Sequence, residues 1–525
     1  MLSLGVQISL SLLGLIIYLG YKLATRNFDY WQKQGVKFLK PVPILGSISS
    51  LFMLREHPCQ FAQRVYRENE GQPFVGYFQG TTQTLMAIDP EFIKQIFVKD
   101  FSHFVDHGFK ISEEGDPLQA LNLFNLEGQR WKDMRTKLVP TFTSGKIKAM
   151  FPLMQECNDQ FDKYLDKLAE SKEIFEAKDV LGRLFTDIIG SCIFGIKCNT
   201  IENPDNQFRK MGKRLIDVNI FQAIKLVFII FLPEIALKLK LGVLENDVSE
   251  FFLKLTKDMV EKRKKEGIVR RDFLQLLMEL KDKGSVAIDA DDEDQHLNEE
   301  TADHKTTSNI PFKFDDIDLA AQSTVFFLAG FETSSTVICF TLLELAMNPD
   351  VQRKAQIEVD ECLAQNNGKI SYDTLKDMKY LDWVLKESMR KYPPVALHSR
   401  LCTKKYVIPE TNVVLEKGTI IGIPNHALQN DPKYFPDPDR FDPERFSDED
   451  LLRKYQYIYT PFGEGPRQCI GNRFASIQSK LALFTFLRKY TVVACPKTVY
   501  PVNFDAKQFI LTSKEGIWLR MEKRQ

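Results

Sequence analysis

The sequence lacks the features on which several large classes of protein depend. Its formal net charge is zero, from 70 Lys and Arg against 70 Asp and Glu residues, so overall charge gives no case for nucleic-acid binding. Its nine cysteines include no Cys-x-x-Cys pair or disulfide-like spacing, and Asn-x-Ser/Thr sequons are absent, which indicates a reducing compartment. Length alone suggests roughly three or four domains, but no linker divides the 525 residues beyond about residue 50. We therefore expect one large domain.

Residues 1–26 are expected to form a membrane anchor. The stretch 2–23 carries no charge before Lys22, and about 20 helical residues span the ~30 Å hydrocarbon layer of a bilayer. No small-residue cleavage site is evident, so a retained anchor is favoured over a removed signal peptide. Basic residues follow, which by the positive-inside rule places the C-terminal side in the cytosol. Residues 27–47 then read as a basic linker and proline-rich hinge, and 48–525 as the main domain.

The segment 462–471 reads Phe-Gly-Glu-Gly-Pro-Arg-Gln-Cys-Ile-Gly, and its cysteine is the principal candidate functional residue. An apolar run of helical spacing begins at Ile470, so Cys469 is expected at or just before a helix N-terminus. Backbone N–H groups and the helix dipole there favour the thiolate over the thiol. Arg467 is expected to hold a carboxylate. A thiolate in this setting suits an axial ligand of haem iron, whereas the alternative is an ordinary core cysteine.

Several segments before residue 150 have readable signals. Residues 73–88 predict a hairpin, and Asp89-Pro90 predicts the start of a short helix. Residues 101–126 predict a long loop rich in Phe, His, Asp and Gly, which is either functional or disordered. A helix over 127–138 would place Trp131 and Arg135 on one face. Their N–H groups could donate to one carboxylate, or the two could be an ordinary amphipathic pair.

Residues 151–281 predict successive helices, interrupted by the apolar run 226–232. This run is too short to span a bilayer, so it is either core or an exposed patch at the membrane surface, and its position favours the patch. Residues 283–310 predict a solvated, disordered loop, because 289–300 carries seven acidic residues and no apolar periodicity.

A long buried helix is predicted from Asp315 or Asp316 to about Met347. Its middle holds a glycine, which costs ~1 kcal/mol against alanine, and the pair Glu332 and Thr333. A buried carboxylate needs partners or a raised pKa, so these residues indicate a functional reason rather than a tolerated local defect.

A second polar cluster is predicted near the C-terminal end of the chain. Glu387 and Arg390 share a helix face at i, i+3, and Arg445 in the segment 441–446 could complete an ion-pair cluster with them. Arg400 follows ten residues after Arg390.

Five segments, in this order, resemble those of cytochromes P450: Trp-x-x-x-Arg, Ala-Gly-Phe-Glu-Thr, Glu-x-x-Arg, Phe-Asp-Pro-Glu-Arg-Phe and the cysteine loop. The resemblance covers essentially the whole chain. It implies a mainly α fold with a smaller β portion, preceded by an N-terminal transmembrane helix. The phenylalanine-rich loops look most like those of insect microsomal members that metabolise xenobiotics.

The resemblance implies a haem b cofactor (iron protoporphyrin IX) with Cys469 as the metal ligand. It implies proton delivery by Glu332 and Thr333, and structural support from the cluster of Glu387, Arg390 and Arg445. The residues it implies at the haem propionates are Trp131, Arg135, Arg400 and Arg467; those it implies in the substrate pocket are Phe104, Phe331, Val395, Leu397 and His398, the last being equally compatible with a supporting role.

The implied reaction is insertion of one atom of dioxygen into a lipophilic small molecule, a xenobiotic or an endogenous lipid or hormone. Electrons would come from NADPH through NADPH–cytochrome P450 reductase, with cytochrome b5 as a second candidate partner. The implied location is the endoplasmic reticulum membrane, with a single pass and a cytosolic catalytic domain. The basic face expected to dock the partner comprises Arg130, Lys132, Arg135, Lys137, Lys146 and Lys148, with Arg135 turned inward.

Two other functions remain open. Some haem-thiolate proteins of this fold are isomerases or dehydratases, against which Glu332 and Thr333 count. A non-enzymatic haem sensor could also use a cysteine ligand.

Overall fold

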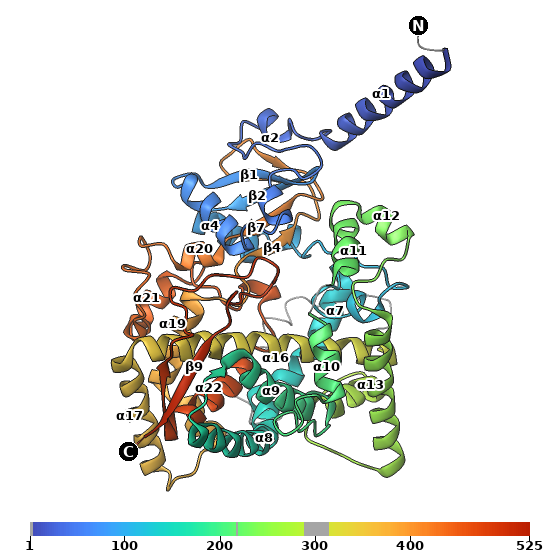
Figure 1. The fold of residues 1–525 in the computed structure, drawn as a ribbon. Coiled ribbons are helices and arrows are strands. Elements are labelled where there is room, and N and C mark those ends of the chain that lie inside the picture. Colours follow the sequence, from blue (N-terminus) through green and yellow to red (C-terminus); the bar gives the residue numbers. More distant parts are fainter. Residues whose placement is uncertain (1–3, 217–218, 288–313, 525) are drawn as a thin grey trace.

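A computed structural model of the protein describes residues 4–216, 219–287 and 314–524. The acidic segment predicted within 283–310 lies outside the described residues except for 283–287. The predicted fold class is confirmed, since helices dominate and the strands form a small part of the chain (Figure 1). The helices that follow the N-terminal region are α4 (Pro58–Glu68), α5 (Pro90–Lys94), α6 (Pro117–Ala120), α7 (Gly128–Leu138), α8 (Ser144–Ser171), α9 (Ala177–Ile189), α10 (Gln207–Arg214), α11 (Ile220–Phe231), α12 (Pro233–Lys238), α13 (Asn246–Glu266), α14 (Phe273–Lys283), α16 (Asp316–Met347), α17 (Pro349–Gln365), α18 (Tyr372–Asp377), α19 (Lys379–Lys391), α20 (Asn425–Gln429), α21 (Glu449–Lys454) and α22 (Asn472–Lys489).

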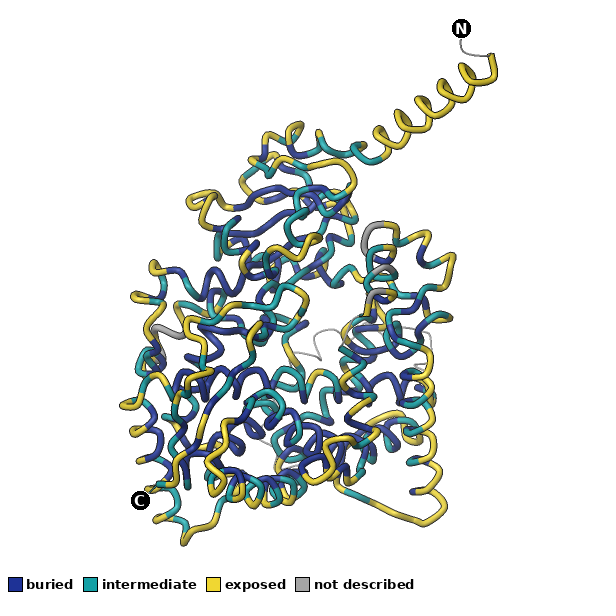
Figure 2. Tube along the Cα trace, in the orientation of Figure 1, coloured by how far each residue is buried: buried dark blue, intermediate teal, exposed yellow. Residues whose placement is uncertain are grey.

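The N-terminal helix α1 (Leu4–Ala24) projects away from the rest of the molecule (Figure 1). None of its residues is buried, and Figure 2 shows it exposed along its length. Its 21 residues are long and apolar enough to cross a membrane. The one other described helix that passes this test is α16, of which 61% of the apolar window is buried inside the protein. We conclude that α1 is the segment suited to anchor the chain.

Residues 27–47 pack against the main domain. Trp31, in the short helix α2 (Tyr30–Lys33), is fully buried and donates its indole N–H to the Tyr77 carbonyl at 3.1 Å. Phe38 pairs with Gly76 in an isolated bridge, and the Ser47 N–H donates to Phe78 at 2.8 Å. The segment predicted as a basic linker and proline-rich hinge is therefore held beside the sheet by these contacts.

The largest sheet has four strands in the order β1-β2-β7-β4. The hairpin predicted from the sequence is confirmed as β1 (Phe74–Gln79) and β2 (Thr82–Ala87), antiparallel around Gly80. The other two strands, β7 (Ile420–Ile423) and β4 (His398–Leu401), come from the C-terminal part of the chain. The smaller sheets comprise β3 (Phe175–Glu176), β9 (Trp518–Lys523) and β8 (Tyr490–Ala494), and the pair β5 (Tyr406–Val407) and β6 (Val414–Leu415).

The long helix α16 crosses the molecule, with α9 and α22 packed on it (Figure 1). It begins where predicted, because the Asp315 side chain accepts hydrogen bonds from the Ile317 and Asp318 N–H groups. It ends before Pro349, also as predicted. A phenylalanine cluster built around Phe327 fills the space beside α9, α10 and α13; its members are Phe194, Phe208, Phe252, Phe327 and Phe331.

Other predicted elements are confirmed with small changes. Asp89 caps α5 by accepting from the Phe92 N–H at 3.1 Å, and α7 follows Glu127 as its N-cap residue. The apolar run 226–232 does not interrupt the helices, because it forms the second half of α11 and leads into α12. A capping box at Asn219 starts α11 at Ile220, so the run lies within the helix as far as Phe231.

Candidate active site

The loop carrying Cys469 is folded tightly by its own backbone. The Cys469 N–H donates to the Phe462 carbonyl at 2.9 Å, and the Gln468 N–H donates to Gly465 at 2.9 Å. Gly465 has a φ of +73°, and a Cβ added there would lie 2.0 Å from the Phe97 carbonyl oxygen. Only glycine therefore lets the loop pass so close to the neighbouring segment. Cys469 lies three residues before α22, close to the predicted place.

Cys469 is the one exposed cysteine of the nine, all of which lie within the described residues. Protein around it still desolvates the sulfur, so burial raises the pKa of the Cys469 thiol. The hydrogen bond from the Gly471 N–H and the nearby Arg135 guanidinium lower it, but not enough to offset burial. The Gly471 N–H at the start of α22 therefore acts in the expected direction on the pKa of the Cys469 thiol, but burial outweighs it. A metal cation at the sulfur would supply the positive charge that stabilises the thiolate, because coordination deprotonates a thiol.

Arg467 lies beneath the loop preceding α7 and is mostly buried. All five of its N–H groups are engaged within the chain. Its Nε donates to Val105 at 2.8 Å, and its terminal nitrogens contact three other backbone carbonyls and Asp106. Its guanidinium also lies 4.0 Å from the Trp131 ring centroid. Arg467 thus has no N–H left for an external carboxylate, and it fixes the position of Trp131.

Arg400, on β4, is a buried guanidinium without a carboxylate partner among the described residues. One terminal nitrogen donates to the Ser399 carbonyl at 2.8 Å and lies 3.3 Å from His107 Nδ1. Its Nε is buried and has no hydrogen-bond partner. Burial lowers the pKa of Arg400 to about 10. An uncompensated buried cation of this kind calls for an anion from outside the chain.

His107 was not identified from the sequence as a site residue. It stacks on Phe124 with ring centroids 4.4 Å apart, and its Nδ1 lies 3.1 Å from the Ser399 carbonyl. Burial and the Arg400 and Arg467 cations hold its pKa well below the usual range, so the imidazole is neutral. The signal for it in the sequence was its position in the aromatic loop 101–126. Its contacts, Ser399 and Arg400, lie on β4, far along the chain.

Trp131 and Arg135 lie on α7, as predicted, and both side chains are largely enclosed. Within the described chain neither the Trp131 indole N–H nor the Arg135 guanidinium makes a hydrogen bond or ion pair. Burial lowers the pKa of Arg135. The pKa of Arg467 falls to about 9, mainly because of burial and also because of the nearby Arg400 and Arg135 cations. Three clustered guanidiniums therefore face few anions. This surplus of positive charge, with an exposed thiol beside it, fits a haem with its metal at Cys469 and its propionates at the arginines.

The middle of α16 is partly accessible, although the helix is otherwise mostly buried (Figure 2). Ala329 is exposed and Thr333, one turn later, is half-buried, so both lie on one accessible strip. The Thr333 hydroxyl donates to the Ala329 carbonyl at 2.6 Å. Gln478 of α22 donates to the Gly330 carbonyl and to Ser334, which ties α16 to the helix that follows Cys469.

Glu332 does not share this strip with Thr333. Its carboxylate forms an ion pair with Lys178 of α9, with Oε1 and Nζ 2.8 Å apart. Neighbouring residues on a helix point in directions about 100° apart, so the acid and the alcohol do not face each other. Lys178 was not identified from the sequence, because nothing in the local pattern of α9 indicates a partner 154 positions away.

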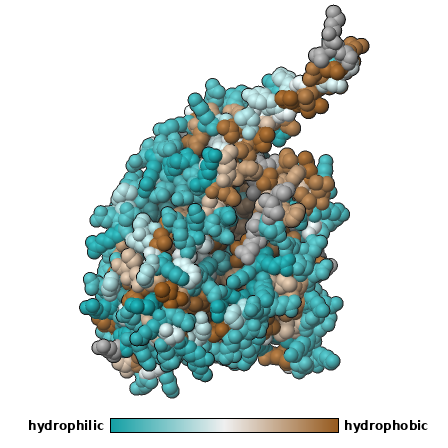
Figure 3. All heavy atoms as spheres, in the orientation of Figure 1, coloured by the Kyte–Doolittle hydropathy of each residue, from teal (hydrophilic) through white to brown (hydrophobic). Residues whose placement is uncertain are grey.

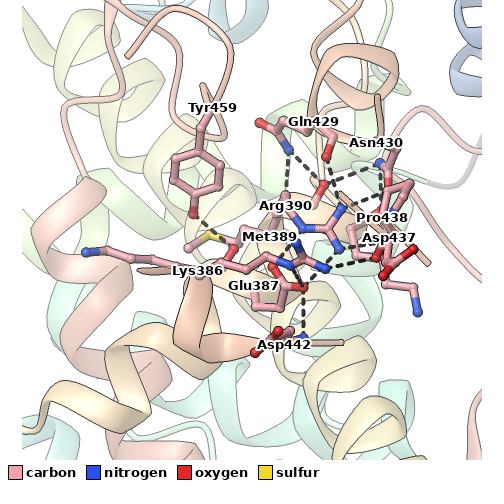
Figure 4. A network of polar contacts seen from close by, with 12 residues as sticks. Lys386, Glu387, Met389, Arg390, Gln429, Asn430, Asp437, Pro438, Asp442 and Tyr459 are labelled. Atoms are coloured by element: carbon pink, nitrogen blue, oxygen red, sulfur yellow. Dashed lines mark hydrogen bonds and ion pairs between the residues drawn. The ribbon is translucent and has the colours of Figure 1, made fainter. Parts of the chain in front are cut away.

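The structure brings Glu387, Arg390 and Arg445 together. Figure 4 shows Glu387 and Arg390 within their network of polar contacts. Arg390 and Glu387 are fully buried and form two contacts, at 2.7 and 2.9 Å. Arg390 also donates to the Gln429 and Pro438 carbonyls, and Arg445 Nε lies 3.4 Å from Glu387. Desolvation raises the pKa of Glu387 despite these partners. The network joins α19 to the segments that lead toward the Cys469 loop.

Phe104 and Phe331, two of the residues that the resemblance implies in the substrate pocket, pack in the core of this structure. Phe104 has no exposed surface and packs on Tyr406 with centroids 4.9 Å apart. Phe331 stacks on Phe327 inside the phenylalanine cluster. Helix and loop geometry turn both rings into the core, which spacing alone did not reveal. Val395 and Leu397 are half-buried beside β4.

His398 lies beside the Cys469 loop. Its Nε2 lies 2.8 Å from the Thr460 carbonyl, and because a carbonyl only accepts, Nε2 carries the proton. Burial lowers the pKa of His398 to about 4, so the ring is neutral. This contact supports the loop, which agrees with the supporting role considered for it.

Comparison with known proteins gives a match over nearly the whole chain. A family model described as Cytochrome P450 matches residues 36–520. Cytochrome P450 9e2 of Blattella germanica is 39% identical over 528 residues, which cover 97% of this chain and 96% of that protein. Probable cytochrome P450 6a13 of Drosophila melanogaster is 39% identical over 522 residues, covering 98% and 99%. Cytochrome P450 6k1 of Blattella germanica is 35% identical over 515 residues, covering 98% and 97%.

Proposed function

Because the chain belongs to the cytochrome P450 family and is a haem-thiolate monooxygenase, we propose that Cys469 is the thiolate ligand of a haem b. The observation that carries this assignment is the position of Cys469. It is the exposed cysteine at the end of a glycine-bounded loop, with Arg135 close enough to affect its titration. The haem supplies the activation of dioxygen, and the chain supplies position, charge and protons.

Arg135, Arg400 and Trp131 are proposed to hold the propionates. Arg400 offers a buried Nε without a partner, and Arg135 and Trp131 offer N–H groups that nothing in the described chain engages. Arg467 contributes its charge and holds Trp131, since its own N–H groups are taken. The buried ion pairs of Glu387 are proposed to fix the segments below the Cys469 loop rather than to take part in the reaction.

Thr333 and Glu332 are proposed to deliver the protons that oxygen activation consumes. Thr333 lies on the accessible strip of α16 and can hold a proton donor near the reacting centre. Glu332 is the nearest carboxylate along the helix, and it must leave Lys178 before it can reach that strip. This pair favours a monooxygenase over an isomerase or dehydratase of the same fold, since those reactions consume no delivered protons.

The membrane contact is proposed to include more than α1. Exposed apolar side chains gather on α11, α12 and the segment after residue 41, at the end of the molecule from which α1 projects (Figure 3). They are Phe221, Phe228, Leu232, Ile235 and Leu239, with Ile44, Phe52, Met53 and Leu54 near α1. The basic residues after α1 support a cytosolic catalytic domain, and the endoplasmic reticulum is the proposed membrane.

NADPH–cytochrome P450 reductase is the proposed electron donor, with cytochrome b5 as a second partner at the same face. Some of the basic residues predicted there are already paired: Arg130 with Glu113 at 2.5 Å and Lys148 with Asp373 at 2.6 Å. Lys137 donates to the Gly284 carbonyl at 2.7 Å. Lys132 has no ion pair within the described chain, so it is proposed as the main contact for an acidic partner.

The substrate is proposed to be a lipophilic small molecule, with xenobiotics favoured over endogenous lipids or hormones. The test is turnover of a panel of 7-alkoxycoumarins by the membrane-reconstituted enzyme with reductase. We expect oxidation that requires NADPH and dioxygen, and a reduced carbon monoxide complex with the red-shifted Soret band of a thiolate ligand. Cys469→Ser should lose that band. A band that survives the substitution would contradict the ligand assignment, and NADPH-independent turnover would favour an isomerase.

A further inference from the structure

A buried glutamine joins the helix that follows the Cys469 loop to the middle of α16. Gln478 lies on α22 and has no exposed surface. Its Nε2 donates to the Gly330 carbonyl at 3.1 Å and to the Ser334 hydroxyl at 2.6 Å. Because a carbonyl only accepts, these contacts fix which end of the carboxamide is the nitrogen. One side chain therefore connects α22 to the turn of α16 that carries Thr333.

This contact reaches α16 at the turn where the helix is weakest. Gly330 lies in that turn, and glycine favours a helix less than any residue except proline, because it gives up the most backbone freedom. A Cβ at Gly330 would lie 2.6 Å from Ile189 Cδ1, so alanine would fit only if Ile189 moved. The position of the turn therefore depends on contacts that other helices make with it.

The Gln478 side chain adds little to the stability of the chain. Its Oε1 is buried and has no hydrogen-bond partner among the described residues. Methionine has a similar length and would leave neither acceptor unsatisfied. The Gly330 carbonyl would keep its helical partner, and the Ser334 hydroxyl could donate to that carbonyl one turn earlier. The stability of the fold alone therefore does not account for a carboxamide at this position.

Gln352 shows what a structural glutamine looks like in the same protein. Its Nε2 donates to the Leu345 and Val492 carbonyls at 3.1 and 2.9 Å, and its Oε1 accepts from the Val492 N–H at 2.7 Å. Both ends of the carboxamide are used, and its loss would leave the Val492 N–H without this partner. Gln352 therefore holds α17 to β8 and stabilises the fold.

We infer that Gln478 is a positioning residue, which fixes the accessible strip of α16 relative to Cys469. The strip comprises Ala329 and Thr333, and the two groups that Gln478 holds belong to the residues directly after them. Cys469 lies three residues before α22, a continuous helix of 18 residues, so the position of the cysteine loop is transmitted along it to Gln478. This inference rests on the role proposed above for Cys469 as the haem ligand.

The test measures amide hydrogen exchange and the C–O stretching band of the reduced carbon monoxide complex in the full-length holoenzyme. In Gln478→Met we expect the amides of residues 330–334 to exchange about 2- to 12-fold faster, the factor that corresponds to one lost hydrogen bond. The C–O band should broaden or split, because the strip then takes more than one position. The red-shifted Soret band should stay, because Cys469 is unchanged.

Gln352→Met is the matched control, because Gln352 is 2% exposed and also links two elements through its carboxamide. It should lower the melting temperature and leave the C–O band unchanged. Gln478→Met should do the reverse, with an unchanged melting temperature and an altered band. If Gln478→Met instead behaved like the control, Gln478 would be an ordinary structural contact and the inference would be wrong.

A double-mutant cycle tests whether Gln478 acts through α16. Ser334→Ala removes one of its two acceptors and should speed amide exchange by less than Gln478→Met does. Ser334→Ala combined with Gln478→Met should match Gln478→Met alone, and fully additive effects would overturn the inference. If Gln478→Met does not fold, Gln478→Leu takes its place in the cycle.

The remaining outcomes separate this inference from the function on which it rests. Faster exchange in Gln478→Met with a wild-type C–O band would show that the contact stabilises α16 without positioning the strip, and would refute the inference alone. A wild-type enzyme without the red-shifted Soret band would refute the assignment of Cys469 itself.

Discussion

Arg400→Leu should change the stability of the chain and its retention of haem in opposite directions. Arg400 is 2% exposed, and burial lowers its pKa to about 10, which corresponds to roughly 3 kcal/mol of unfavourable free energy for the charged form. Replacing it removes that cost. It also removes a hydrogen bond to Ser399 and a contact with the Phe97 ring at 5.0 Å, each worth about 1 kcal/mol. We expect the haem-free chain to gain about 1 kcal/mol in the free energy of unfolding.

The same substitution should weaken haem retention. A hydrogen bond to a charged group contributes about 1.5–3 kcal/mol, which corresponds to about a 10- to 150-fold change in affinity. Haem release would be followed by transfer to excess apomyoglobin, and the stability of the haem-free chain by urea unfolding. We expect faster release together with an unchanged or higher urea midpoint.

The matched control is Arg263→Leu. Arg263 is 3% exposed like Arg400, but it is paired with the fully buried Asp272 through contacts of 2.8 and 2.5 Å. Its loss should cost about 3–5 kcal/mol, because it removes the buried partner of Asp272 and leaves that carboxylate only the ion pair with the more exposed Arg270 at 3.2 Å. If Arg400→Leu destabilised the haem-free chain as much as this control, Arg400 would already be satisfied within the chain. If haem release were unchanged, its assignment to a propionate would be wrong.

Three further predictions concern protons, membrane and partner. Thr333→Ala should leave haem and substrate binding intact but convert NADPH consumption into peroxide release, and unchanged coupling would exclude the proton-delivery role. Deleting residues 2–26 should weaken attachment to liposomes without abolishing it, because the apolar surface of α11 and α12 remains; full solubility in low salt without detergent would contradict that surface. Lys132→Glu should raise the reductase concentration needed for half-maximal rate and leave peroxide-driven oxidation unchanged, since exposed charges act mainly on association. An equal fall by both routes would refute the docking role.

Several features of the molecule followed from the sequence because they depend on local chemistry. The length of the segment 2–23 and its lack of charge before Lys22 predicted the membrane helix. Asp315 and Pro349 predicted the two ends of α16. Alternation around Gly80 predicted the hairpin. The spacing of the cysteine loop predicted both the family and the candidate ligand. Each of these signals lies within a few residues of the feature it specifies.

Tertiary structure decided which side chains have partners, and no local pattern carries that information. Arg467 and Arg400 look alike in the sequence, yet backbone carbonyls from residues 105–126 and the Asp106 carboxylate engage every N–H of the first, while the second keeps a buried Nε without a partner. Phe104 and Phe331 turned out to be core residues because distant aromatic rings pack on them.

The clearest case is Glu332. Its neighbour Thr333 suggested an acid and an alcohol acting side by side, but helix geometry turns the two apart. The carboxylate instead meets Lys178, which a separate helix brings to within 2.8 Å. The sequence by itself therefore determined that an acid stands in the middle of a buried helix. Only the packing of α9 against α16 decided where that acid rests, because an ion pair requires two charges that the chain brings together only when it folds.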